Sequence, residues 1–191
     1  MRKPKMVTIG GSAGAVRVVQ EFLAALPKEP LNAAFTVVMH ISRSLSVNYR
    51  LIYGERHAGL TEEIKDKMPF EPGNFYFAPA DYHVLIEKNG TYSLTQDELV
   101  NFARPSIDVT FESVASVFGE RACGVLLTGS NGDGALGLRE ISIAGGMTFV
   151  QDPRTCDYPT MAQAALDLFV PSAVLSITDI AARVASWVRE S

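Results

Sequence analysis

The sequence is short of cysteine and has no long hydrophobic run. Its 191 residues include only two cysteines, Cys123 and Cys156, which are too few for a disulfide framework and are typical of proteins from a reducing compartment. No stretch approaches the ~18 consecutive apolar residues that a transmembrane helix requires. We therefore expect a cytoplasmic protein that does not insert into a membrane.

Positive charge is scarce as well. The 17 Lys and Arg residues are outnumbered by 21 Asp and Glu residues, which gives a net charge of −4. Binding to the phosphate backbone requires a basic surface, so nucleic acid is not an expected partner. The three histidines and two cysteines show no metal-ligand spacing, and we expect neither a metal nor another cofactor.

The sequence does have the composition of a globular domain, with 47% hydrophobic and 20% charged residues, and residues 1–191 are expected to form a single domain. Apolar strands are predicted at 6–9, 35–39, 124–127 and 147–150, and helices at 15–26, 106–118, 135–144 and 178–189. This alternation predicts an α/β fold with a doubly wound, mostly parallel sheet covered by helices on both faces. Three further short strands are predicted at 74–78, 84–87 and 91–94. With the Asn89-Gly90 turn between the last two, they predict an antiparallel hairpin excursion at the edge of that sheet.

A glycine-rich turn joins the first predicted strand to the first helix. The stretch Gly10–Gly14 matches the G-x-S-x-G motif in the strand–turn–helix context where its serine, here Ser12, can act as a nucleophile. From the motif alone, a structural turn with Ser12 as an ordinary N-cap is equally consistent. Cys156 is a weaker candidate nucleophile, because no histidine lies near it in the sequence.

Only three histidines could serve as the base for a serine nucleophile. His40 directly follows the second predicted strand and should lie, with Ser12, at the carboxyl edge of the sheet, where open α/β sheets bind ligands. His57 stands in a polar stretch and is expected to be solvated. His83 begins an apolar strand and is expected to be packed or hydrogen-bonded there. His40 is therefore the predicted base.

The predicted acid is Asp133, which follows a strand and precedes the helix predicted to start at Ala135. It should also lie at the carboxyl edge, where it could hold His40 in the required tautomer. Taken alone, Asp133 would be interpreted as the cap of its own helix. Asp108, in the first turn of another helix, is a weaker candidate. The order Ser–His–acid differs from the Ser–acid–His order of α/β-hydrolases, which excludes that fold but not the chemistry.

An ordered series of motifs resembles one known family, the catalytic domain of the chemotaxis receptor methylesterases (CheB). The motifs are Ile9–Gly14, Met39-His40, Phe75–Pro79, Arg104–Asp108, Leu127–Ala135, Gly145-Gly146 and Gln151–Pro153. They run in this order over nearly the whole chain. The resemblance implies a serine hydrolase that demethylates glutamyl methyl esters on chemoreceptors with release of methanol, and that often also deamidates receptor glutamines.

The resemblance also implies roles for individual residues. The family nucleophile falls on Ser12, the base on His40 and the acid on Asp133, while backbone amides of Ala13 and Ser130 would bind the oxyanion. The implied partners are the methylated cytoplasmic helices of chemoreceptors. Family members commonly carry an N-terminal phospho-receiver domain. None is expected within residues 1–191, so activity would be constitutive or controlled in trans by a separate response-regulator protein.

The sequence departs from the family pattern next to the predicted acid. The family has Thr-Gly-Met-Gly where this chain has Thr128-Gly129-Ser130-Asn131, and its Met-Pro pair reads Met161-Ala162 here. Two alternatives follow. One is an esterase or deamidase that acts on a different substrate, because fold and triad do not fix the substrate. The other is a catalytically impaired α/β binding module.

Overall fold

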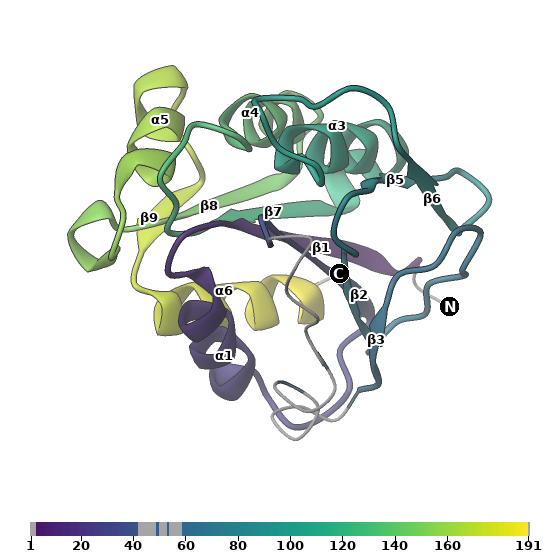
Figure 1. Ribbon diagram of the computed structural model, residues 1–191. Coiled ribbons are helices and arrows are strands. Elements are labelled where there is room, and N and C mark those ends of the chain that lie inside the picture. The colour runs from purple at the N-terminus through teal and green to yellow at the C-terminus, as the bar shows by residue number, and fades with distance from the viewer. Residues whose placement is uncertain (1–2, 42–48, 50–52, 54–58, 191) are drawn as a thin grey trace.

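A seven-stranded parallel sheet forms the centre of the computed structural model, which describes residues 3–41, 49, 53 and 59–190. The strand order is β3-β4-β2-β1-β7-β8-β9, and each adjacent pair runs parallel (Figure 1). The strands are β1 (Lys5–Gly11), β2 (Ala33–Met39), β3 (Thr61–Glu63), β4 (Phe75–Phe77), β7 (Ala122–Leu126), β8 (Met147–Gln151) and β9 (Ala173–Leu175).

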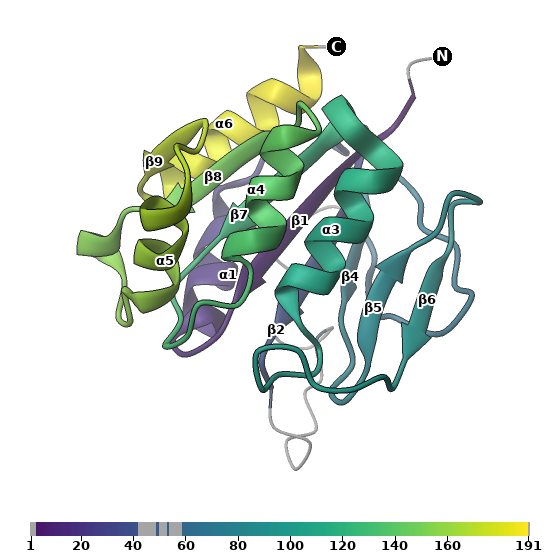
Figure 2. The same cartoon turned by 90° about the horizontal axis from the view of Figure 1, so that it is seen from above.

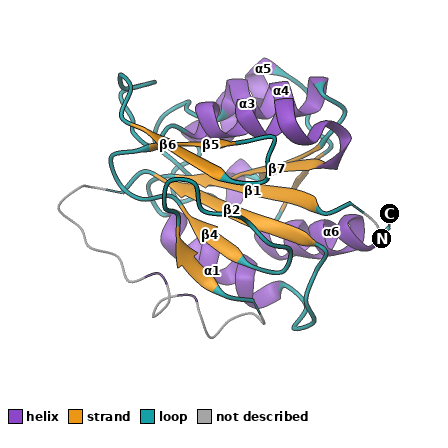
Figure 3. Cartoon of the chain, turned by 90° about the vertical axis from the view of Figure 1, so that its right-hand side faces the viewer, coloured by secondary structure: helices purple, strands orange, loops and turns teal. Residues whose placement is uncertain are grey.

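Helices cover both faces of this sheet. They are α1 (Ala15–Ala25), α3 (Ile107–Phe118), α4 (Ala135–Ile143), α5 (Thr160–Leu168) and α6 (Ile177–Arg189), with short 3₁₀ turns at Gly119–Arg121 and Pro153–Thr155. Helices α1 and α6 lie on one face, and α3, α4 and α5 lie on the other (Figure 3). The predicted doubly wound α/β architecture is thus confirmed.

The central strand β1 shows why the sheet needs covering on both faces. All seven of its residues are buried. Val7 and Ile9 join the core beneath α1 and α6, whereas Met6 joins the core beneath α3, α4 and α5. Successive side chains of a strand point to opposite faces, so a doubly covered strand is apolar on both sides rather than alternating. Full burial of each such side chain contributes about 1.5–3 kcal/mol.

The central region differs from the predicted arrangement. Strands β5 (His83–Ile86) and β6 (Tyr92–Thr95) form the expected antiparallel pair, but this pair is a separate two-stranded sheet that packs against α3 (Figure 2). Strand β4 is not part of the excursion, because it pairs parallel with β2 inside the main sheet. Within the described part of the chain, no helix is long and apolar enough to cross a membrane.

Three elements were not predicted from the sequence, namely β3, β9 and α5. Strands β3 and β9 have three residues each and occupy the two edges of the sheet. β3 lacks the apolar pattern of a strand covered on both faces, and β9, although apolar, is too short to be distinguished by periodicity. Helix α5 has nine residues, and two of its three buried side chains are alanines, which gives little hydrophobic periodicity to detect.

Candidate active site

Sheet register brings Ser12 and His40 to the same place. Strands β1 and β2 pair in parallel up to Gly11 and Met39, so the next residue of each chain segment, Ser12 and His40, leaves the sheet at the same edge. The amide of His40 donates to Gly11 O at 3.3 Å. The amide of Ser12 donates to Thr128 O at 3.0 Å, which ties the serine to the loop after β7.

Ser12 is not the N-cap of α1. Gly14 holds that position with φ of 79° and no side-chain cap, a left-handed conformation that favours glycine. The carbonyl of Ser12 instead accepts from Ala15 N at 3.0 Å. The hydroxyl of Ser12 makes no hydrogen bond to any other residue that the structure describes. It is therefore available to a substrate or to a nearby base.

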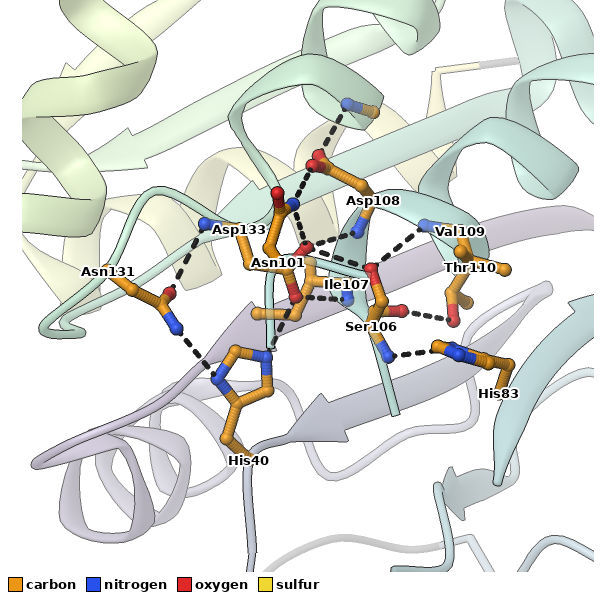
Figure 4. A network of polar contacts seen from close by, with 11 residues as sticks. His40, His83, Asn101, Ser106, Ile107, Asp108, Val109, Thr110, Asn131 and Asp133 are labelled. Atoms are coloured by element: carbon orange, nitrogen blue, oxygen red, sulfur yellow. Dashed lines mark hydrogen bonds and ion pairs between the residues drawn. The ribbon is translucent and has the colours of Figure 1, made fainter. Parts of the chain in front are cut away.

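His40 is paired with a buried carboxylate. Its Nε2 lies 2.8 Å from Asp133 Oδ2, with the His40 side chain 14% exposed and the Asp133 side chain fully buried (Figure 4). An ionised carboxylate only accepts hydrogen bonds, so Nε2 carries the proton in this pair. Nδ1 is then unprotonated, and this is the nitrogen that can accept a proton.

Asp133 receives four further hydrogen bonds. They come from Ile107 N at 2.7 Å, Ser106 Oγ at 2.8 Å, Asn101 Nδ2 at 3.0 Å and Asp108 N at 3.3 Å. Ile107 N and Asp108 N belong to the first turn of α3, whose positive dipole end favours an anion. Burial opposes ionisation of Asp133, but the hydrogen bonds outweigh it and lower the pKa of this carboxyl.

The capping interpretation of Asp133 is therefore wrong for its own helix. The residue preceding α4 is Gly134, with φ of 96° and no side-chain cap. Asp133 instead accepts hydrogen bonds from two N-terminal amides of α3, a helix that begins 26 residues earlier in the sequence. The sequence could not reveal this, because the two segments meet only through the order of the strands.

Asp108 holds two helices together but does not contact His40. Its Oδ1 accepts from Gly137 N of α4 at 2.8 Å, and its Oδ2 accepts from Asn101 Nδ2 at 2.8 Å. The amide of Asn101 thus bridges Asp108 and Asp133. Burial, with the charge of Asp133 adding to it, raises the pKa of Asp108 to about 6. Asn101 was not singled out by the sequence analysis, and no sequence motif marks it.

Two backbone amides remain available near Ser12. Neither Ala13 N nor Ser130 N donates to another described residue. Both neighbouring segments are fixed, because Thr128 Oγ1 donates to Ala13 O at 3.1 Å and accepts from Tyr158 N at 2.9 Å. Gly129 N also donates to Tyr158 O at 2.9 Å. Free amides on a rigid frame are what an oxyanion site requires.

Asn131 lies against the free nitrogen of His40. Its Oδ1 accepts from Asp133 N at 3.2 Å, which sets the orientation of the amide. Its Nδ2 then faces His40 Nδ1 at 3.5 Å, a distance at the outer limit of a hydrogen bond. The side chain that departs from the family pattern is therefore in contact with the predicted base.

The other candidates take structural roles or lie outside the described residues. His83 is buried, accepts from Ser106 N at 3.1 Å and contacts Glu98 O at 3.0 Å, as expected for a packed histidine. His57 lies outside the described residues. Burial raises the pKa of the half-buried Cys156 to about 11, so its thiol stays protonated. Among the described residues, no group of three or more potential ligands could hold a metal ion.

Comparison with known proteins identifies the family. A sequence model of the CheB methylesterase family matches residues 7–184. The chain belongs to the CheB methylesterase family. A relative from Leptospira interrogans serovar copenhageni, provisionally named protein-glutamate methylesterase/protein-glutamine glutaminase, is 38% identical over 177 residues. The aligned region covers 92% of this chain and 90% of the relative.

Further members of the CheB family agree in sequence and in fold. The protein-glutamate methylesterase/protein-glutamine glutaminase of Symbiobacterium thermophilum is 34% identical over 93% of this chain. The chain spans 49% of that relative's length. The crystal structure of the Thermotoga maritima CheB methylesterase catalytic domain superposes with a TM-score of 0.91 at 25% identity, covering 97% of this chain and 100% of the other.

Proposed function

We propose that this chain is a protein-glutamate methylesterase in which Ser12, His40 and Asp133 form the catalytic triad. The observation that carries the proposal is the pairing of His40 Nε2 with the buried Asp133 carboxylate at 2.8 Å. His40 follows β2, which is paired with β1, the strand that Ser12 follows. The relatives carry this activity in their names. Their second named activity suggests that the same site also deamidates protein glutamines.

The arrangement supports a two-step acyl transfer. Ser12 Oγ attacks the carbonyl carbon of the glutamyl methyl ester while His40 Nδ1 takes the hydroxyl proton. The amides of Ala13 and Ser130 bind the oxyanion. His40 then returns its proton to the departing methoxide, which leaves as methanol. Water, activated by the same nitrogen, hydrolyses the acyl-enzyme to free glutamate and Ser12. With a glutamine substrate, the leaving group is ammonia.

The proposal extends to the substrate and its setting. The substrates are methylated chemoreceptor cytoplasmic helices, so the protein works in the cytoplasm, where its two free cysteines stay reduced. Control by a response-regulator protein in trans remains a prediction from the family resemblance.

The test is methanol release from a chemoreceptor fragment that carries radiolabelled glutamyl methyl esters. Native chain is compared with Ser12→Ala, and with Ser116→Ala as a matched control, because Ser116 is an exposed serine on α3. We expect release by the native and control chains and a loss of at least 10³-fold in Ser12→Ala.

A fluorophosphonate probe separates the alternatives. Labelling of Ser12 without methanol release would mean an active serine hydrolase with a different substrate. Folded native protein that neither releases methanol nor reacts with the probe would refute the triad.

A further inference from the structure

A loop with two exposed apolar side chains adjoins His40. It connects β6 to α3, and it presents Leu99 with 53% and Phe102 with 99% of its surface exposed. An isolated exposed apolar residue is common. A phenylalanine with almost no intramolecular contact beside a candidate active site is less so, because nothing in the fold accounts for its placement.

The loop is held in one conformation. Asn101 and Phe102 have φ of 51° and 62°, a left-handed backbone that asparagine tolerates but that is unfavourable for phenylalanine. Val100 and Ala103 exchange two backbone hydrogen bonds, of 3.2 and 2.9 Å. The side chain of Asn101 is held by the carboxylates of the buried network. The exposed phenylalanine is therefore presented by an ordered backbone.

Arg104 braces the base of the loop. Its guanidinium pairs with Asp81 at 2.6 Å and donates to the carbonyls of Gln96 and Asp97 at 2.8 and 2.7 Å. The side chains of Arg104 and Asp81 are mostly buried, with 15% and 21% exposed. A partner that packs onto this loop would not have to order it first, which removes one of the usual costs of binding.

The loop forms part of a cavity that reaches the catalytic base. The cavity has a volume of about 420 Å³, and its lining includes His40, Ile41, Leu99, Asn101, Phe102 and Asn131. It is open to solvent and combines polar groups next to His40 with apolar side chains from the loop. Anything that fills it is in contact with the imidazole, so a permanently bound partner would block the reaction. A substrate, which arrives and leaves with each turnover, can occupy it without stopping the reaction.

We propose that Leu99 and Phe102 form the docking surface for the protein substrate. An apolar side chain that neighbours the methylated glutamate in the substrate packs on Phe102, while the ester side chain enters the cavity beside His40. This inference rests on the proposed function and names the part of the site that recognises polypeptide rather than ester. Aromatic side chains are frequent anchors of this kind at interfaces.

The test compares a protein ester with a small ester. We would measure kcat/KM of native chain, Phe102→Ala and Val170→Ala on a methylated receptor fragment and on phenyl acetate. Val170 is 90% exposed and lies between α5 and β9, away from the loop. For Phe102→Ala we expect the ratio of protein to small-ester kcat/KM to fall about tenfold or more, mainly through KM. Phe102→Leu should recover part of the loss, and Val170→Ala should leave both rates unchanged.

The outcomes separate this inference from the proposed function. Native chain that hydrolyses the receptor ester while Phe102→Ala keeps the native ratio would overturn the docking surface and leave the methylesterase intact. An equal loss on both esters would also overturn it, because the loop would then act on the chemistry. Native chain that hydrolyses phenyl acetate but not the receptor ester would remove the proposed function, and the inference with it. Circular dichroism of each variant checks that the fold is retained.

Discussion

Replacement of Asp133 by asparagine preserves the shape of the side chain and should still lower activity by several orders of magnitude. An amide presents one acceptor and one donor where the carboxylate presents two acceptors. The native carboxylate receives donors at both oxygens, so one set of donors must face the new NH₂ group. Which set it faces decides the outcome, and the structure allows the two orientations to be compared.

If the NH₂ group takes the place of Oδ1, it faces Asn101 Nδ2, Ser106 Oγ and Asp108 N. Only the serine hydroxyl can turn to accept from it, so two donors lose their partner. If it takes the place of Oδ2, it faces His40 Nε2 and Ile107 N. The imidazole can change tautomer and accept, which leaves one backbone amide unpaired. The second orientation is therefore favoured.

Two results follow for Asp133→Asn. One buried amide without a partner costs about 1–3 kcal/mol of unfolding free energy. The tautomer change moves the proton to Nδ1 of His40, the nitrogen that accepts the Ser12 proton in the proposed mechanism, so kcat should fall about 10³–10⁴-fold.

Chemical denaturation and methanol release measure the two effects, with Asp167→Asn on the exposed face of α5 as the control. Nitrogen chemical shifts of His40 would report the tautomer directly. Retention of activity within tenfold of native would refute this account, as would an imidazole still protonated on Nε2.

Three other substitutions test separate parts of the structure. A Cβ added at Gly137 would lie 2.6 Å from Phe111 Cβ and 2.7 Å from Asp108 O. Although alanine has the better helix propensity, Gly137→Ala should lower the free energy of unfolding, measured in urea, by about 1–3 kcal/mol. A rise in this free energy would contradict the packing. The raised pKa of Asp108 means that the folded state binds a proton more tightly than the unfolded state, so this residue's contribution to stability falls as pH rises from 3.8 to about 6. The free energy of unfolding, measured by denaturation across this range, should fall with pH, and Asp108→Asn should reduce that slope. An unchanged slope in the variant would contradict the raised pKa. Asn131→Gly removes the amide that faces His40 Nδ1 and the acceptor Oδ1 to which Asp133 N donates. Methanol release should be retained or rise a few-fold, with about 1 kcal/mol less stability. A tenfold fall in rate would show that the amide assists the base.

Much of the fold could be predicted because the buried strands are distinctive. The runs at 6–9, 35–39 and 147–150 are apolar without alternation, which is typical of parallel strands with both faces covered. Helix α3 could be placed from Ser106, whose hydroxyl accepts from Val109 N at 3.4 Å as an N-cap should. The edges were harder, since a strand such as Thr61–Glu63 has only three residues and two of them are exposed.

The candidate site was predictable in its residue types but not in its connections. Strand–turn–helix order placed Ser12, His40 and Asp133 at one edge of the sheet. It could not show that the amide of Asn101 bridges two carboxylates, because side-chain direction in a left-handed loop has no sequence signature. Nor could it show that the N-terminus of α3 supports Asp133, since that contact depends on how the helix lies across the sheet.

The order of the strands explains how the residues of the proposed triad come to one edge of the sheet. Strand β1, which leads to Ser12, lies between β2, which leads to His40, and β7, which leads to Asp133. Neighbouring strands are about 4.8 Å apart, so the ends of β2 and β7 are separated by about 10 Å. The histidine and the aspartate must therefore reach toward one another across the end of β1.

For His40 and Asp133 to meet across the end of β1, the strand must carry a small residue beneath them. Gly10 meets this requirement, because a Cβ there would lie 2.3 Å from Ile107 Cγ2. Ile107 packs its side chain over this glycine and donates its amide to Asp133 Oδ2 at 2.7 Å. A larger residue at position 10 would push α3 outward, remove an amide from the Asp133 carboxylate and disturb His40 without changing any residue of the proposed triad. Gly10 therefore matters for the positions of Asp133 and His40 as well as for the turn that leads to Ser12.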